Sequence, residues 1–543
     1  MPSSFLRPGP WLLASLLCIA LPLTGCGGGG GSDDSSPTPP PGGGGGSGEA
    51  ATISGKLTFD QVPHNQSTNG LNHSATVEAP IRGVTVQLLD GSTVVDTDVS
   101  DASGNYSFDA ETGTSYRIRI RAELKQSGTQ SWDIEVVDNT SSNAQYVLDT
   151  STFTVSSTSE TRDINADSGW GGSSYTSTRA AAPFNILDRV YVIIQKLQNV
   201  DSNLTLDPLV INWSVNNIPE SGNLATGRIG TSFYTQDQIY LLGAANTDSD
   251  EYDGHVIIHE WGHYFEDNNA RSDSIGGPHG GGDRLDMRVA FGEGFGNAWS
   301  GIITDDPFYR DSFGTNQSQG FSINVENNNV SNPGWFSEGS VQSILYDVYD
   351  GADDDLANLG LQPIYDVLTG QQRNTEAFTS IFSFMTYLKA ENTSDVAALN
   401  DLLNGQNIDI NVDIWGSNET DNEGQPSVIP VYNELSPGDT QEVCTITTFG
   451  NDRNKLGNRK FLRLNIQSAG NYTLRLTPSG SNDLDGYIYN QGQLVAFTEA
   501  LGTSTVDITE NFAAGTHVAD VLAYNSSGSA IVGTCFDVSL IQN

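Results

Sequence analysis

The sequence predicts a multidomain protein, in which a β-sandwich is followed by an α+β domain with a helical second half and then by a second β-sandwich. Three observations lead to this fold class. The 543 residues exceed what a single hydrophobic core organises. Short alternating apolar runs, broken by turn residues, occupy both ends of the chain. Apolar residues at helical spacing dominate the middle, above all after residue 254.

The chain is strongly acidic, with 24 basic against 66 acidic residues and a net charge of -42. Nucleic acids and anionic membrane surfaces would both be repelled by such a charge. We therefore expect no nucleic-acid partner. The composition favours a soluble, secreted protein that remains a monomer.

Residues 1–25 have the pattern of a signal peptide. Arg7 precedes the apolar run "WLLASLLCIALPL", which is too short to span a membrane comfortably. The run ends in "LTGC", which resembles the bacterial lipoprotein signal, whose cysteine becomes the lipidated first residue of the mature chain. The resemblance implies that Cys26 carries the lipid and, because residue 27 is Gly rather than Asp, that the protein reaches the outer membrane or cell surface. An ordinary secretory signal with an incidental cysteine is the alternative.

Residues 26–50 are rich in Gly, Ser and Pro, which predicts a flexible tether. Residues 51–160 then show β patterns, and "SYRIRIRAEL" alternates as a strand with one solvated face does. The stretch from "IRGVTVQLL" to "YRIRIRA" resembles the small β-sandwich repeats of bacterial surface adhesins and carboxypeptidase regulatory domains. Such modules are usually spacers or docking units, so we predict no chemistry in this domain.

The central domain is predicted over residues 165–425. Its first helix follows Pro183, a residue favoured at helix starts, and covers 182–200. Two strand candidates come next, "LVINWSV" and "DQIYLLGAA". Further helical patterns cover 255–268, 288–304, 338–350, 375–390 and 394–404.

The segment "HVIIHEWGHYFED" contains three of the seven histidines of the chain. His259 and His263 are four residues apart, so on a helix they project from one face, one turn apart. Two imidazoles in that arrangement can share one zinc ion, and Glu260 between them points far enough round the helix to reach a water at the metal. The surrounding apolar residues predict a mostly buried helix, where unpaired His and Glu side chains would be costly.

This His-Glu-x-x-His pattern is the signature of zinc metallopeptidases, in which the glutamate is the general base. The resemblance implies a zincin-like domain that binds Zn²⁺ and hydrolyses peptide bonds of a protein or peptide substrate, with Glu260 as the base. A structural helix whose histidines are only hydrogen-bonded is the alternative.

A catalytic zinc needs a third protein ligand, and Glu293 in "RVAFGEGFGNAWSG" is the main candidate. Its helix is rich in glycine, which allows close approach to the first helix. No third histidine follows at the metzincin spacing, because residue 269 is Asn. The arrangement resembles the gluzincins, such as thermolysin and the aminopeptidases, whose third ligand is a Glu on the next long helix. In this chain Asn297 takes the place of the acid that often follows four residues later, and we expect it to hold a ligand histidine.

Other residues compete for places at the site. The loop "DSIGGPHGGGDRLDMR" supplies His279, Asp283 and Asp286, and an aspzincin-like site would use one of the aspartates as a ligand. The Gly-Thr-x-Asp pattern of that group is absent. His255 lies one turn before His259, and we expect a supporting or surface role for it. Glu266 is expected to be a solvated helix residue.

The reaction also requires a group that stabilises the oxyanion of the tetrahedral intermediate. Thermolysin-like enzymes use a downstream His, and this chain has none between residues 280 and 516. Aminopeptidases use a Tyr, so Tyr346 and Tyr349 are the candidates for a catalytic role. Ordinary packing is the alternative for each of them.

Two acidic clusters, "NTDSDEYD" at 246–253 and "YDGADDD" at 349–355, make Ca²⁺ a second candidate cofactor. Neither cluster has the EF-hand spacing. For the first cluster, N-capping of the histidine helix by Asp250 or Asp253 explains the acids equally well.

Strand patterns return over residues 430–543. The stretch "KFLRLNIQSAGNYTLRLTPSGSNDLDGYIYNQGQLVAF" resembles the bacterial pre-peptidase C-terminal domain, and the match covers most of residues 440–540. Outside the signal region only Cys444 and Cys535 remain, and two thiols in an oxidising compartment indicate one disulfide. The resemblance implies that they pair across the sandwich.

A different class of function remains open. The alternative is a non-enzymatic surface-binding or adhesion lipoprotein, with recognition by the two sandwiches and a structural metal. Structural zinc is usually closed by cysteines, and none lies near the histidines. Hydrolysis of a non-peptide amide is a third reading of the motif.

Overall fold

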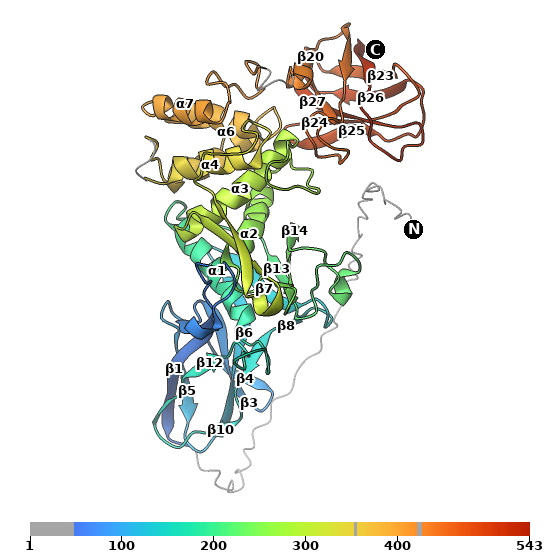
Figure 1. The fold of residues 1–543 in the computed structure, drawn as a ribbon. Coiled ribbons are helices and arrows are strands. Elements are labelled where there is room, and N and C mark those ends of the chain that lie inside the picture. The colour runs from blue at the N-terminus through green and yellow to red at the C-terminus, as the bar shows by residue number, and fades with distance from the viewer. Residues whose placement is uncertain (1–47, 352–355, 421–425) are drawn as a thin grey trace, which may run out of the picture. The chain divides into compact units, whose positions relative to one another are not determined.

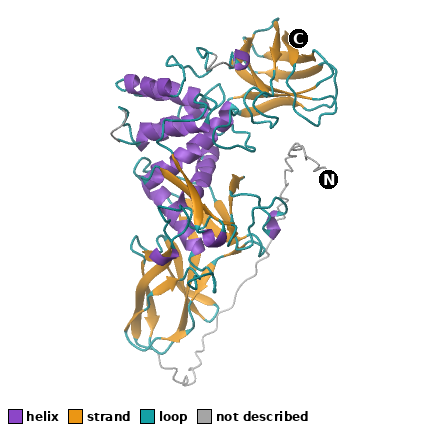
Figure 2. Cartoon of the chain, viewed as in Figure 1, coloured by secondary structure: helices purple, strands orange, loops and turns teal. Residues whose placement is uncertain are grey.

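Figure 1 shows the computed structural model, which describes residues 48–351, 356–420 and 426–543. The predicted signal peptide, Cys26 and all but the last residues of the tether lie outside the described residues. Strands dominate both ends of the described chain and helices dominate its middle, as Figure 2 shows by colour. This order of elements agrees with the mixed α and β organisation that the sequence predicts.

The N-terminal region is a β-sandwich whose two sheets enclose alternating apolar side chains. In β6, for example, Tyr116, Ile118 and Ile120 are buried while the arginines between them are partly exposed. One sheet is centred on β1, which pairs with β2, β5, β11 and β12, and the other contains β3, β4, β6 and β7. The strands are β1 (Ala50–Gln61), β2 (Val77–Pro80), β3 (Val84–Asp90), β4 (Thr93–Val99), β5 (Asn105–Glu111), β6 (Ser115–Gln126), β7 (Trp132–Asp138), β8 (Ala144–Gln145), β9 (Val147–Asp149), β10 (Phe153–Thr154), β11 (Ser159–Thr161) and β12 (Ile164–Ala166).

The second of these sheets continues into the central region. Its order is β14-β15-β13-β7-β6-β3-β4, and β13 pairs in parallel with β7. The two strands predicted before the histidine helix therefore extend a sheet that begins in the N-terminal sandwich. One hydrophobic core also runs through both regions. The sequence places a domain boundary near residue 160, but the sheet crosses it, because β7 supplies an edge on which β13 can pair.

The helices lie close to their predicted positions, with two exceptions. The helix expected over 375–390 begins only at Ile381, where the Ser380 amide donates a hydrogen bond to the Ser383 hydroxyl. The short α5 after Gly360 is not predicted. The helices are α1 (Ala182–Gln198), α2 (Gly254–Asn268), α3 (Met287–Thr304), α4 (Glu338–Tyr349), α5 (Leu361–Thr369), α6 (Ile381–Glu391) and α7 (Val396–Gly405). The strands of this region are β13 (Leu209–Trp213), β14 (Phe233–Thr235), β15 (Gln238–Leu241), β16 (Gly243–Ala244), β17 (Asp248–Ser249), β18 (Phe308–Phe313) and β19 (Gln319–Asn324).

Helix α3 forms despite its four glycines. Each glycine in a helix interior costs about 1 kcal/mol relative to alanine. Against this cost, every residue from Met287 to Ile303 is buried, so apolar packing surrounds the helix on all sides. The side chain of Asp286 accepts a hydrogen bond from the Arg288 amide and caps the N-terminus.

The C-terminal region is a second β-sandwich with its own core. One sheet has the order β20-β22-β27-β24-β25 and the other β21-β28-β23-β26. The strands are β20 (Tyr432–Leu435), β21 (Thr440–Cys444), β22 (Arg459–Ile466), β23 (Gly470–Pro478), β24 (Asp483–Asn490), β25 (Gln493–Thr498), β26 (Val506–Phe512), β27 (Gly515–Tyr524) and β28 (Cys535–Gln542).

The predicted disulfide between Cys444 and Cys535 is confirmed. Its expected position across the sandwich is wrong, since the two cysteines face each other on β21 and β28, which are antiparallel neighbours in one sheet. The bond joins the first and last strands of that sheet in chain order and closes a loop with a sequence separation of 91 residues.

Replacing both cysteines by serine should destabilise the C-terminal sandwich by about 2–4 kcal/mol, because the reduced chain gains the entropy of a long open loop. Differential scanning calorimetry of the full chain measures the effect, and limited proteolysis with mass spectrometry identifies residues 430–543 as the segment that opens first. Unchanged melting and cleavage would show that strand packing alone holds the sandwich closed.

Candidate metal centre

Helices α2 and α3 approach each other closely at glycines. A Cβ atom added to Gly262 of α2 would lie 3.5 Å from the Cα atom of Gly296 and 3.3 Å from the ring of Trp299. A Cβ atom added to Gly296 would lie 2.8 Å from two ring atoms of His259. The His259 ring therefore occupies the space that any side chain at position 296 would fill, and the glycine-rich sequence of α3 makes this packing feasible.

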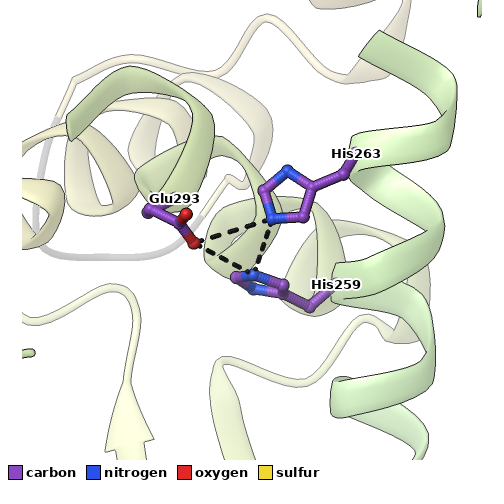
Figure 3. Close-up of side chains that lie close together, drawn as sticks. All are labelled: His259, His263 and Glu293. Carbon is purple, nitrogen blue, oxygen red and sulfur yellow. Dashed lines mark hydrogen bonds and ion pairs between the residues drawn. The ribbon is translucent and has the colours of Figure 1, made fainter. Parts of the chain in front are cut away.

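This packing brings His259, His263 and Glu293 together, as Figure 3 shows. The Nε2 atoms of the two histidines are 3.1 Å apart. The Oε2 atom of Glu293 is 3.4 Å from Nε2 of His259 and 3.6 Å from Nε2 of His263. Each residue thus contributes one donor atom to a triangle that lies between α2 and α3.

The triangle has the size of one face of a zinc coordination tetrahedron. Zinc–nitrogen and zinc–oxygen bonds of about 2.0–2.1 Å place two ligands of a tetrahedral ion about 3.4 Å apart. The three observed separations scatter around that value. Two imidazoles and one carboxylate also match the chemistry of a catalytic zinc site, which uses three protein ligands. These residues fit Zn²⁺.

Asn297 fixes the orientation of His259. Its Oδ1 atom is 3.0 Å from Nδ1 of His259, and its Nδ2 atom donates to Oε1 of Gln342 at 3.0 Å. Because the amide nitrogen faces Gln342, the amide oxygen faces the ring and accepts a hydrogen bond from the Nδ1–H group. The Nε2 atom of His259 is then left with a free lone pair for a metal. Asn297 therefore lies where the sequence places it.

Glu266 holds the second histidine and is not the solvated residue that the sequence suggests. Its side chain is 1% exposed, and its Oε2 atom is 3.6 Å from Nδ1 of His263. Burial lowers the pKa of the His263 imidazole, but its contacts with Glu266 and Glu293 outweigh burial and raise the pKa well above the usual range. The sequence contains a signal for this contact, because His263 and Glu266 are three residues apart and therefore lie on the same face of the helix.

The pKa of Glu293 is shifted in the opposite direction. Burial raises the pKa of its carboxyl group, but the hydrogen bonds from His259 and His263 outweigh this effect and hold the pKa well below the usual range. The carboxylate is therefore ionised at neutral pH. An ionised carboxylate is the form that binds a cation.

His279 reaches the same carboxylate from the glycine-rich loop that precedes α3. Its Nε2 atom is 3.2 Å from Oε2 of Glu293, and its Nδ1 atom is 2.9 Å from Oε2 of Glu338 at the start of α4. Burial lowers the pKa of His279, but the two carboxylates outweigh burial and raise it to about 10. The sequence names His279 only as a competing residue and misses Glu338, because nothing in the local pattern links α4 to the loop.

Glu260 lies beside the triangle with its carboxylate uncommitted. No hydrogen bond or ion pair joins it to any residue of the described chain. Its negative charge helps to raise the pKa of His263 and of Tyr309. The ring of Tyr309, on β18, lies 6.2 Å from the ring of His259. A carboxylate without a hydrogen-bond partner, next to two imidazoles that could bind a metal, is the arrangement that a general base requires.

Tyr346 and Tyr349, expected to stabilise an oxyanion, lie elsewhere. The Tyr346 ring packs against Gly301, eight residues along α3 from Glu293, which is about 12 Å of helix. The Tyr349 hydroxyl donates to Asp305, beyond the end of α3. The geometry corrects this expectation, because α4 runs along α3 away from the triangle after Glu338.

The other residues that the sequence suggests for the site form contacts away from the triangle. His255 is buried with Nε2 3.3 Å from the Asp306 carbonyl oxygen and 3.2 Å from the Thr304 hydroxyl, so it does not support the metal ligands as expected. Asp283 forms an ion pair with Lys455 at 2.8 Å. Asp286 caps α3 and pairs with Arg288 at 2.7 Å. Neither aspartate lies in the ligand triangle, which removes the basis of an aspzincin-like site.

Residues 199–404 match the family model of the mycolysin C-terminal domain. The matched range contains the three triangle residues, and the match indicates a protease-associated protein. The match covers less than half of the chain. No curated protein matches the sequence.

Three solved structures are similar to parts of the chain. The pre-peptidase C-terminal domain of a collagenase from Bacillus anthracis has 13% identity, covers 20% of this chain and 93% of its own, and has a TM-score of 0.17. A carbohydrate-binding protein of Pseudomonas aeruginosa, assigned as putative, has 14% identity, coverage of 22% and 89%, and a TM-score of 0.13. A periplasmic lysozyme inhibitor of Aeromonas hydrophila has 11% identity, coverage of 20% and 96%, and a TM-score of 0.14.

Among the described residues, none of the helices has the length and apolar character needed to cross a membrane.

Replacing Gly296 by Ala should weaken metal binding by about 10- to 100-fold, because the new methyl group displaces the His259 ring from its position against Asn297. Zinc titration monitored by calorimetry measures the affinity. Gly405→Ala is the matched control, since a Cβ atom there meets nothing within 4 Å. Equal zinc affinities for the two variants would mean that the ring position is not set by this contact.

Proposed function

We propose that the protein is a secreted, lipid-anchored zinc endopeptidase. The observation that carries this proposal is the triangle of His259, His263 and Glu293, with Glu260 free beside it. The match of residues 199–404 to a protease-associated family also supports a peptidase function. A site that served only to hold the fold together would have no use for an uncommitted buried carboxylate next to its ligands.

The residues around the triangle have different roles in the proposed peptide hydrolysis. Bound there, zinc would supply a Lewis acid that polarises the substrate carbonyl and acidifies a water. Glu260 accepts the proton of that water and later delivers it to the leaving amine. Asn297 and Glu266 hold the two histidines at their Nδ1 atoms, so that both Nε2 atoms face inward.

His279 and Glu338 replace the tyrosines as candidates for stabilising the oxyanion. Glu338 accepts from Nδ1 of His279 and thereby holds the ring in place, while Nε2 points toward the triangle. An imidazole held by a carboxylate in this manner stays protonated and can donate a hydrogen bond to a developing negative charge. The sequence does not predict this role for His279, because this histidine precedes Glu293 in the chain and no histidine occurs between residues 280 and 516.

Strand β14 offers a place for an extended substrate. The strand β15, formed by part of "DQIYLLGAA", is paired on both sides, by β13 and β14, and has no free edge for a peptide. The edge of the sheet is β14, whose Tyr234 hydroxyl donates to Asp267 near the end of the histidine helix. A peptide that adds to this edge would gain main-chain hydrogen bonds.

Anchoring at the outer membrane is part of the same proposal. It rests on the lipoprotein-like "LTGC" ending at Cys26 and on the Gly-rich tether. Mass spectrometry of the mature N-terminus tests it directly, since a diacylglycerol-modified cysteine has a distinct mass.

Glu260→Gln should abolish cleavage of casein or a generic quenched peptide, by about 10²–10⁴-fold, because the amide cannot accept a proton. Metal content measured by mass spectrometry should remain near that of the parent chain. Glu376→Gln, a change at an exposed acid, is the matched control and should leave cleavage unchanged. Glu293→Ala should instead lose the metal together with activity. Full activity in Glu260→Gln would refute the proposal.

His279→Gln should lower kcat by about 10²–10³-fold with little change in KM, because the hydrogen bond is needed only in the transition state. Glu338→Gln should give a smaller loss, since Glu338 acts by positioning the ring. Both variants should keep their zinc. Parallel losses of zinc and activity in His279→Gln would assign the residue to the metal ligands and not to the oxyanion.

A further inference from the structure

A second group of acidic side chains lies at the start of the histidine helix. Asp248 is on β17, Asp250 follows in the loop to α2, and Asp311 is on β18, which pairs with β17 at Phe313. Each of the three carboxylates offers one oxygen, and these oxygens all lie within 4.8 Å of one another. The residues are distinct from the triangle of the metal centre.

These carboxylates lack a balancing cation although Asp250 is buried and Asp248 and Asp311 are partly buried. Asp250 is only 3% exposed. One of its oxygens accepts from the Ser232 hydroxyl, whereas its Oδ1 atom is buried with no hydrogen-bond partner. The Oδ1 atom of Asp248 is buried and unpartnered as well. Among the residues that the structure describes, no Lys, Arg or His forms an ion pair with Asp248, Asp250 or Asp311.

Asp253 and Gln317 add further oxygen atoms near the three carboxylates. Asp253 is fully buried, and its oxygens are taken by the Ser312 amide and hydroxyl and by His64. Asp253 stands at the N-cap position of α2, but its side chain makes no capping hydrogen bond. Gln317 donates to the carbonyl oxygen of Ala244, which is paired opposite Asp248, while its own Oε1 atom is buried and unpartnered. Because the Asp253 side chain does not cap α2, helix capping does not explain the acidic residues of this loop.

Burial and the negative charge of neighbouring carboxylates raise the pKa values of these three groups. Burial, and then the charge of Asp253, raises the pKa of Asp248 to about 6 and that of Asp311 to about 8. Burial and Asp253 likewise raise the pKa of Asp250 well above its usual range. Without a cation the cluster has to retain protons at neutral pH, and a bound divalent ion would replace them.

We infer that Asp248, Asp250 and Asp311 form a binding site for a hard divalent cation of the calcium type. All the donors are oxygens, which excludes the nitrogen- and sulfur-preferring metals. Calcium accepts six to eight oxygens in irregular geometry, whereas magnesium requires a near-ideal octahedron, and carboxylates from two strands and a loop suit the more tolerant ion.

Such an ion would fix the N-terminal end of the histidine helix. It would join β17 and the loop into α2 to β18, and β18 carries Tyr309, whose ring contacts His259. This inference does not depend on the proposed peptidase activity, because it concerns other residues and its test uses no hydrolysis.

The test uses the full chain, freed of calcium by passage over a chelating resin and checked for retained zinc by mass spectrometry. Equilibrium dialysis with radioactive calcium at neutral pH and physiological salt should give one saturable site. Asp250→Asn should weaken binding by about tenfold or more, since one charged ligand is lost. Asp401→Asn, a charge change at an exposed acid on α7, should leave binding unchanged. Magnesium at equal concentration should compete poorly.

Thermal melting distinguishes the ion from the alternative of bound protons. With calcium, Asp250→Asn should melt below the parent chain. Without calcium it should melt at the same temperature or above it, because the neutral amide avoids the cost of protonating or burying a carboxylate at this position. Asp311→Asn should behave in the same way and serves as the second variant. The inference is overturned if either variant melts above the parent in both conditions, if calcium binding is unaffected by both, or if magnesium competes as well as calcium.

Discussion

The candidate metal centre depends on the close approach of α2 and α3. Gly296 leaves room for the His259 ring, and Gly262 faces it across the helix contact. Any side chain at position 296 would push His259 away from both Glu293 and Asn297. Glycine is costly in a helix interior, and here that cost is offset by burying α3 on all sides. The packing of α2 against α3 therefore sets the positions of the side chains that form the candidate metal centre.

Several buried charges around this contact are paired, either within one helix or with a residue of another element. Glu266 faces His263 within α2, Glu338 of α4 faces His279, and the C-terminal sandwich takes part as well. At the start of α3, Arg288 is 1% exposed and pairs with both Asp286 and Asp520, the latter on β27. Removing one member of such a network leaves an uncompensated buried charge, which typically costs about 3–5 kcal/mol. The C-terminal sandwich thus helps to hold the helix that carries Glu293.

Most of the fold could be predicted from local patterns, and the exceptions share one cause. Alternation marked the strands of both sandwiches, and apolar periodicity marked α1, α2, α3 and α4. The continuation of the N-terminal sheet through β13 escaped prediction, because parallel pairing between strands about 75 residues apart leaves no local signature. The disulfide was foreseeable from cysteine count, whereas its place within one sheet depended on which strands became neighbours.

The sequence by itself predicted the candidate site residues that lie on one helix and the next. His259, Glu260 and His263 follow from helical spacing. Glu293 and Asn297 were expected because of the resemblance to the gluzincins. Only the tertiary structure decided which groups surround them. His279 and Glu338 meet across 59 residues, and Tyr346 points away from the site although its helix passes beside it. Spacing along a helix fixes directions within one turn, but contacts between elements depend on how whole faces pack.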